Sequence, residues 1–186
     1  MKKKVLFIQG GGDSGYKADA ILVASLQEEL GDDYQIIYPP IPTDSNAPDF
    51  GWPDQIGKEI TAFRKEFVLV AHSLGASMLL KFLSENEVSI KATGILLIAT
   101  PFWSGNEQWK QRLKLQEGFA QNLPKSSRLF FYHSRDDEEV PFDHLAYYKQ
   151  NLPEATFREI KNGGHQLSTN VNVVASDIKA LYDLSV

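Results

Sequence analysis

Residues 67–75 read Phe67-Val68-Leu69-Val70-Ala71-His72-Ser73-Leu74-Gly75, an apolar run that leads into a serine flanked by small residues. A continuous apolar run of this length is typical of a strand that is buried on both faces. Helical spacing then extends from Ser73 to Asn86, so the sequence predicts a sharp strand-to-helix turn at the serine. Such a turn lifts the hydroxyl clear of the sheet, and Ala71 and Gly75 are small enough for strand and helix to cross closely.

Strands and helices alternate along the rest of the chain. Because strands that alternate with helices are joined by parallel crossovers, we predict a three-layer α/β sandwich with about six mostly parallel strands. The 186 residues, 42% of them hydrophobic, fit one domain spanning 1–186. The further strands are expected at 5–9, 34–38, 92–99, 128–133 and 156–160, and the helices at 18–30, 53–65, 144–151 and 170–182, with a mixed helical stretch at 109–122.

The composition excludes several classes of function. The net charge is −5 and the basic residues are dispersed, so the sequence predicts no nucleic-acid surface. No apolar stretch approaches the ~20 residues of a membrane-spanning helix, and the run after Lys4 is too short for a signal peptide. The absence of cysteine excludes disulfides, zinc-thiolate sites and cysteine nucleophiles, and it agrees with a reducing compartment. We therefore expect a cytoplasmic protein with no membrane partner.

Ala71-His72-Ser73-Leu74-Gly75 matches the nucleophile-elbow pattern, with alanine in place of the first glycine. The pattern alone is weak, because a match arises by chance in roughly one chain in eight. A serine at this point can also simply cap the helix that follows. The strand before Ser73 and the helix after it favour a nucleophile.

A serine nucleophile needs a base to accept its proton and a carboxylate to orient that base. His165 follows Asn162-Gly163-Gly164 in the loop after the last expected strand, where an imidazole can reach over the sheet edge. Residues 136–139 offer four carboxylates after the preceding strand. Most acidic clusters are solvated loops, so at most one of these four carboxylates is expected to orient the histidine.

Together these residues resemble the α/β-hydrolase superfamily, and Val68–Gly75 is similar to its small retinoblastoma-binding-protein-type serine hydrolases. The resemblance spans nearly the whole chain and implies a minimal fold without a large lid, cofactor or metal. The acid of that superfamily commonly lies three residues before a Val-Pro pair, which implies Asp137, with Asp136 as the reserve candidate. Its Gly-His signature implies that His165 is the base.

The resemblance also implies an oxyanion hole. It would consist of the backbone N–H groups of Leu74 and Gly11, with Gly12 as an alternative to Gly11. Gln9 stands where relatives often have histidine, which can reshape this loop. For the acyl group of the substrate we expect an open, apolar site, although aromatic residues at such spacing are more often plain packing. The candidates are Trp52, Phe102, Trp103 and Trp109, together with Phe50 and Phe119.

Two rival interpretations remain. Gly10-Gly11-Gly12-Asp13-Ser14-Gly15 fits a dinucleotide-binding fingerprint, but no acidic residue ends the next strand to bind a ribose. A hydrolase scaffold can also be an inactive protein-binding module, because fold alone never establishes activity. The sequence favours a serine hydrolase that cleaves a small ester, thioester or amide, acting on a small-molecule acyl substrate.

Overall fold

The computed structural model describes residues 2–12 and 14–184. Within these ranges six strands form one sheet in the order β2-β1-β3-β4-β5-β6, and every pair of neighbours is parallel. The expected parallel sheet is confirmed. The strands are β1 (Lys3–Ile8), β2 (Tyr34–Ile37), β3 (Phe67–His72), β4 (Ala92–Ile98), β5 (Arg128–Ser134) and β6 (Thr156–Ile160).

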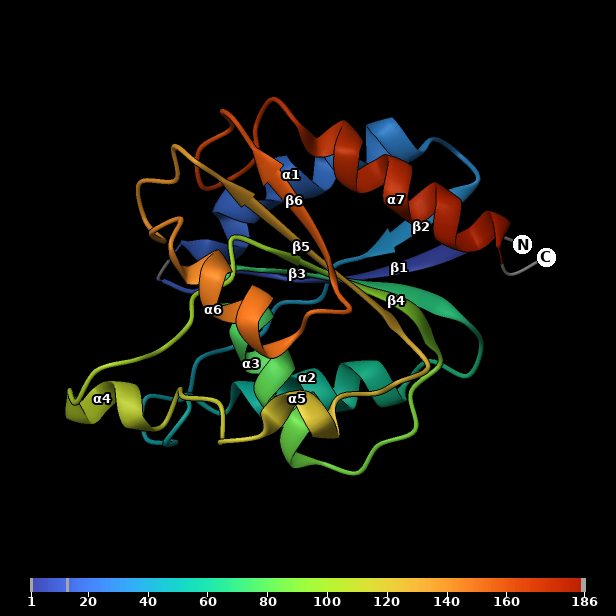
Figure 1. The fold of residues 1–186 in the computed structure, drawn as a ribbon. Coiled ribbons are helices and arrows are strands. Elements are labelled where there is room, and N and C mark those ends of the chain that lie inside the picture. The colour runs from blue at the N-terminus through green and yellow to red at the C-terminus, as the bar shows by residue number, and fades with distance from the viewer. Residues whose placement is uncertain (1, 13, 185–186) are drawn as a thin grey trace.

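Helices cover both faces of the sheet (Figure 1), which confirms the three-layer sandwich. Helices α1 (Gly15–Leu30) and α7 (Val171–Asp183) pack together on one face. The other face carries α2 (Trp52–Thr61), α3 (Ser73–Glu85), α5 (Phe119–Asn122) and α6 (His144–Asn151). The short helix α4 (Gln108–Gln111) projects from the end of the molecule opposite the two termini.

The two helical layers explain why the strands are apolar throughout. In β3, Leu69 and Ala71 face the core beneath α2 and α3, whereas Val68 and Val70 face the core beneath α1 and α7. Residues that alternate between two buried faces all have to be apolar. All six residues of β3 are accordingly buried.

The stretch 109–122 departs from expectation. It contains only the end of α4 and the short helix α5, joined by turns and loop. Gly118 has a φ of 76°, in the left-handed region that helices exclude, and Trp109 is 57% exposed. Leu113 and Phe119 are buried, so this segment is held by isolated apolar anchors instead of a continuous apolar face.

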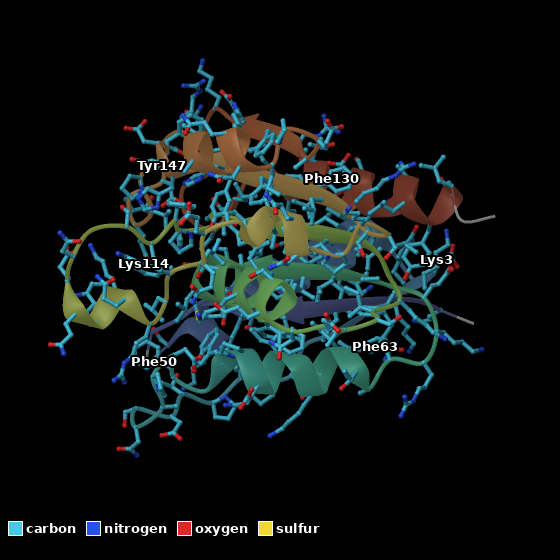
Figure 2. The ribbon with its side chains drawn as sticks, turned by 60° about the horizontal axis from the view of Figure 1, so that its bottom comes forward. Lys3, Phe50, Phe63, Lys114, Phe130 and Tyr147 are labelled. Carbon is cyan, nitrogen blue, oxygen red and sulfur yellow. The ribbon has the colours of Figure 1, made fainter. Side chains whose placement is uncertain are left out.

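The topology fixes where a ligand can bind. The chain leaves β1 into α1 on one face and leaves β3 into α3 on the other, so the connections that follow these two adjacent strands go to opposite faces of the sheet. Ligands of open α/β sheets bind in the crevice at such a switch point. Figure 2 shows Phe50 at the end of the molecule away from Lys3, the first residue of β1. No helix within 2–12 and 14–184 is long and apolar enough to cross a membrane.

Candidate active site

Ser73 occupies a strained turn between β3 and α3. His72 is still extended, with a φ of −118° and a ψ of 138°, whereas Ser73 has a φ of 51°. A residue with a side chain in this region costs roughly 1–3 kcal/mol, and such strain concentrates at functional sites. The backbone of the turn therefore has the conformation that the nucleophile-elbow pattern predicts.

Gly75 lets the turn pass close to β1. A Cβ atom on Gly75 would lie 2.0 Å from the carbonyl oxygen of Gln9 and 2.9 Å from Cγ2 of Ile8. No real Cβ tolerates a backbone oxygen at that distance, so any side chain here would push α3 away from the sheet. This close packing explains why the pattern requires a small residue at the position of Gly75.

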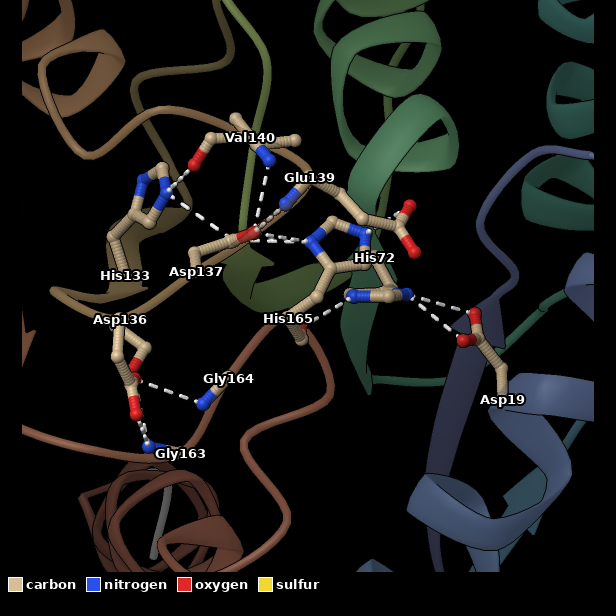
Figure 3. Close-up of polar contacts among 11 residues, drawn as sticks. Asp19, His72, His133, Asp136, Asp137, Glu139, Val140, Gly163, Gly164 and His165 are labelled. Carbon is tan, nitrogen blue, oxygen red and sulfur yellow. Dashed lines mark hydrogen bonds and ion pairs between the residues drawn. The ribbon is translucent and has the colours of Figure 1, made fainter.

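His165 and Asp137 form a pair on neighbouring loops. The Nδ1 atom of His165 lies 3.0 Å from each carboxylate oxygen of Asp137 (Figure 3). The backbone N–H groups of Glu139 and Val140 donate to the same carboxylate over 2.9 and 2.8 Å. Nε2 of His133 lies 3.3 Å from it as well. The carboxylate is thus held in place by the loop that carries it.

These contacts shift the pKa values of both partners. Burial alone would raise the pKa of Asp137, but hydrogen bonds from His133, His165 and the two backbone amides outweigh it and hold that pKa far below the usual value. Burial alone would lower the pKa of His165, but the hydrogen bond and charge of Asp137, followed by the charge of Glu139, raise it above 6.5. The pair is an ionised carboxylate beside a basic imidazole.

Asp136 has a different environment from its neighbour. Its Oδ1 accepts the backbone N–H of Gly163 over 3.0 Å and that of Gly164 over 2.9 Å, and it also accepts the hydroxyl of Ser134. These bonds lower the pKa of Asp136 and fix the backbone just before His165. Of the two candidate acids, Asp137 contacts the imidazole and Asp136 holds the loop (Figure 3).

The residue before Ser73 contacts His165, but Ser73 itself has no direct bond to it in the part of the chain that the structure describes. The imidazole rings of His72 and His165 have centroids 4.6 Å apart, and Ser73 is the next residue after His72. Among the hydrogen bonds of residues 2–12 and 14–184, none joins the Ser73 hydroxyl to His165, and Nε2 of His165 lies 3.7 Å from Glu139 Oε2. Catalytic hydrogen bonds are often long without substrate.

The two expected oxyanion donors lie on segments that touch. A Cβ atom on Gly11 would lie 2.7 Å from Cδ2 of Leu74 and 3.0 Å from its Cβ, so only glycine fits against the turn. Gly12, the alternative donor, has a φ of 88°. The side-chain oxygen of Gln9 accepts the N–H of Ile41 over 2.9 Å, which ties the loop after β1 to the segment after β2.

One cavity adjoins this loop, and a second cavity shares a lining residue with the first. The first, of about 490 Å³, is lined by Leu74, Gly12 and Tyr16 beside the turn and by Ile41, Thr43 and Phe50 farther out. The second, of about 510 Å³, shares Phe50 and continues to Trp109 and Arg112. The shared phenylalanine makes the two cavities adjoining compartments, and α4 supplies the outer wall.

Of the expected aromatic residues, only Trp109 and Phe50 line these cavities. Trp52 is 1% exposed, because it belongs to the buried face of α2, and its indole N–H donates to Thr43 over 3.3 Å. Phe102 stacks on Tyr147. Trp103 donates from its indole to Ser77 on α3 over 3.0 Å. The structure thus places Trp52, Phe102 and Trp103 in packing positions, and Phe119 is buried in the same core.

Sequence reasoning missed the residues that surround the turn. Asp19 and His72 form a buried contact, and His133 supports Asp137. One signal was available for Asp19: with Leu22 and Leu26 it recurs at helical spacing, so a carboxylate stands on the apolar face of α1. A buried carboxylate requires a partner, and this one has His72.

The structure also bears on the rival interpretations. Asp13 of the glycine-rich motif lies outside the described residues, and β2 is followed by Tyr38 and two prolines, with no carboxylate to bind a ribose. Among the residues that the structure describes, no three His, Cys, Asp or Glu side chains are grouped so as to hold a metal ion.

Comparisons with known proteins place the chain in a family. The family model described as serine hydrolase matches residues 40–171, more than half of the chain. No curated protein sequence matches. The fold is similar to that of the ydeN gene product of B. subtilis, with a TM-score of 0.73 and 22% identity over 98% of this chain and 100% of that chain.

Two further solved structures share the fold at lower identity. The meta-cleavage product hydrolase CumD of Pseudomonas fluorescens IP01 has a TM-score of 0.76 at 12% identity, over 99% of this chain and 92% of that chain. SOBER1 of Arabidopsis thaliana has a TM-score of 0.66 at 14% identity, over 98% of this chain and 100% of that chain. The parallel sheet, the strained serine turn and the family match agree that the chain belongs to the serine hydrolase family of the α/β-hydrolase superfamily.

Proposed function

We propose that this serine hydrolase cleaves a small ester, thioester or amide through an acyl-enzyme on Ser73. In this proposal His165 is the general base, Asp137 orients it, and the backbone amides of Gly11 and Leu74 bind the oxyanion. The observation that carries the proposal is the left-handed backbone of Ser73 at the end of β3, beside a histidine that is already paired with a carboxylate.

The acylation step follows from these positions. The Ser73 oxygen attacks the substrate carbonyl while Nε2 of His165 takes the hydroxyl proton, which forms a tetrahedral oxyanion. Collapse breaks the bond to the leaving group, which receives that proton from His165 and departs as an alcohol, thiol or amine. General-base help of this kind is typically worth ~10²–10⁴ in rate.

Deacylation repeats the sequence with water. His165 takes a proton from a water molecule, the hydroxide attacks the acyl carbonyl, and the carboxylic acid leaves as the proton returns to the Ser73 oxygen. The negative charge develops on the carbonyl oxygen in both halves of the reaction. Each backbone donor aimed at it is typically worth ~10²–10³ in rate, so the contact between Gly11 and Leu74 supports the proposal.

The adjoining cavities suggest how the substrate lies. The compartment next to Leu74 is lined by Tyr16, Ile41 and Phe50, which suits a compact apolar acyl group. The compartment beyond Phe50 opens past Trp109 and suits a bulkier leaving group or the rest of a longer substrate. Phe50→Ala is expected to broaden the range of accepted acyl chains.

The direct test is covalent labelling with a fluorophosphonate, followed by intact-mass spectrometry. We expect the wild type to gain one label, and Ser73→Ala and His165→Ala to gain none at the same probe concentration. Ser176→Ala is the matched control, because that hydroxyl is exposed on α7 and, among the described residues, bonds only to the carbonyl of Asn172. It is expected to label like the wild type.

The alternative is an inactive scaffold that binds another protein. A wild type that is folded by circular dichroism but gains no label would favour that alternative. A label that persists in Ser73→Ala would place the nucleophile elsewhere.

A further inference from the structure

A second Asp–His pair lies behind the candidate site. Asp19 of α1 and His72, the last residue of β3, each have a side chain that is 1% exposed. Nδ1 of His72 lies 2.9 Å from Oδ1 of Asp19 and 3.0 Å from Oδ2 (Figure 3). Neither residue belongs to the Ser73, His165 and Asp137 group. Burying such a pair carries a desolvation cost, so its retention suggests a role in the site.

The hydrogen bonds of His72 fix its role. Its Nε2 lies 3.0 Å from the backbone carbonyl oxygen of His165, and a carbonyl can only accept, so Nε2 donates. Burial alone would raise the pKa of Asp19, but its bonds to His72, to the Gly10 amide and to the Gln166 side chain lower it. An ionised carboxylate also only accepts, so Nδ1 donates too. With both nitrogens donating, His72 has no lone pair for a Ser73 proton.

Asp19 also holds the loop of the expected oxyanion hole. Its Oδ2 accepts the backbone N–H of Gly10 over 2.6 Å. A Cβ atom on Gly10 would lie 3.0 Å from Nδ1 of His72 and 3.2 Å from Cβ of Ser73, so this loop lies directly against the serine turn. The next residue, Gly11, contacts Leu74. One carboxylate therefore bonds to the loop after β1 and to the residue before the serine.

We propose that Asp19 and His72 are positioning residues that hold three parts of the site in register: the Gly10 loop, the turn before Ser73, and the backbone of His165. This inference rests on the proposed function of Ser73 and His165. Asp137 fixes the ring of His165 from one side through its Nδ1, whereas His72 fixes its main chain from the other (Figure 3). Both the ring and the main chain of His165 are thereby held.

The two oxygens of Asp19 suggest a pair of variants. In Asp19→Asn the amide oxygen can take the place of Oδ2 and accept the Gly10 N–H, and the amide nitrogen can take the place of Oδ1 and donate to Nδ1 of His72. His72 then stays protonated on Nε2 and keeps its bond to His165. Asp19→Ala removes both contacts. If the variant with alanine fails to fold, Asp19→Leu removes the same contacts at similar volume.

The first readout is turnover of a reactive ester per fluorophosphonate-labelled site, which removes the contribution of unfolded protein. We expect kcat of Asp19→Ala to fall about 10²-fold, because a displacement near 1 Å at a catalytic group costs that much, while KM changes little. Asp19→Asn is expected to recover most of the loss. Asp177→Ala is the control, because it removes a carboxylate of α7 that bonds to Tyr132 and Arg158, and it is expected to leave kcat unchanged.

The second readout does not need activity. In the ¹⁵N spectrum of imidazole-labelled protein, both ring nitrogens of His72 are expected to show the shifts of hydrogen-bond donors. The His165 ring signals are expected to move in Asp19→Ala but to stay near their wild-type positions in Asp19→Asn. Unmoved His165 signals in Asp19→Ala, or an Asp19→Asn variant as slow as Asp19→Ala, would overturn the inference. An unlabelled wild type would instead defeat the proposed function and leave the spectral test valid.

Discussion

The two Asp–His pairs have the same chemical groups and opposite surroundings. In Asp137–His165 the carboxylate accepts hydrogen bonds from the backbone of its own loop. Nδ1 of the imidazole contacts that carboxylate, whereas Nε2 makes no hydrogen bond within the described residues and lies 3.7 Å from Oε2 of Glu139. In Asp19–His72 both imidazole nitrogens are engaged, and both side chains are buried against the sheet. The first pair can move a proton. The second pair can only hold its neighbours in place.

The comparison shows that a histidine can act as a base only if one ring nitrogen is not already donating a hydrogen bond, whichever carboxylate binds the other nitrogen. An imidazole bonded at one nitrogen is oriented and remains basic at the other. An imidazole that donates at both nitrogens, as His72 does, has none left to accept a proton. Variants of Asp137–His165 should therefore lose more activity than variants of Asp19–His72, whereas variants of Asp19–His72 should lose more stability.

The largest expected effect is on the activity side of the comparison. Asp137→Asn removes the charge that raises the pKa of His165 and supplies an amide that favours the wrong imidazole tautomer. We expect kcat on an activated ester to fall by roughly 10⁴-fold. Steady-state kinetics at pH 8 would measure it.

Asp136→Asn is the matched comparison, because the two carboxylates are adjacent in sequence. Asp136 accepts the backbone N–H groups of Gly163 and Gly164 with the same oxygen, Oδ1, so an amide oxygen in its place can keep both bonds. Its expected loss is roughly 10²-fold or less. If Asp136→Asn were the slower variant, the acid assignment would be reversed.

The sequence was sufficient to predict the parallel sheet, because a strand that is buried on both faces has a continuous run of apolar residues. Val68, Leu69 and Val70 all have to be apolar when helices cover both sides, and the same reasoning applies to β1 and β4. It was insufficient for 109–122, where Leu113 and Phe119 anchor a loop. Isolated buried residues show no repeating apolar spacing, so the sequence could not distinguish this loop from a helix.

The next effect is on the stability side. His72→Ala leaves the buried Asp19 carboxylate without its histidine partner, with the amide of Gly10 as its remaining backbone donor. Breaking a buried pair in this way costs about 3–5 kcal/mol in the free energy of unfolding. Urea denaturation at pH 7 would measure the loss.

His165→Ala removes the same atoms from the other pair. Asp137 then keeps His133 and the amides of Glu139 and Val140, so its carboxylate stays satisfied and the loss of stability is expected to be smaller. Equal losses in the two variants would contradict the division between a catalytic pair and a cross-link.

The site was only partly predictable, for a related reason. Ser73, Asp137 and His165 follow strands at the same edge of the sheet, so order along the chain suggested them together. Asp19 lies in the middle of a helix, and its link to His72 exists only after α1 packs on the sheet. Aromatic residues were the least predictable, because Trp52 and Trp109 look alike in sequence and differ only in which way their helices face.

The smallest expected effect is a shift in pH dependence. His165 must be neutral to accept a proton, and its pKa is raised above 6.5, so kcat/KM should fall as the pH drops through a value above 6.5. The same raised pKa stabilises the folded state below pH 6.5, and that contribution is lost as the pH rises through the folded value. In Asp137→Asn burial remains and the raising charge is gone, so the acid limb should move to lower pH. A pH profile of kcat/KM measures both, and an acid limb that does not move would mean that His165 is not the group that titrates.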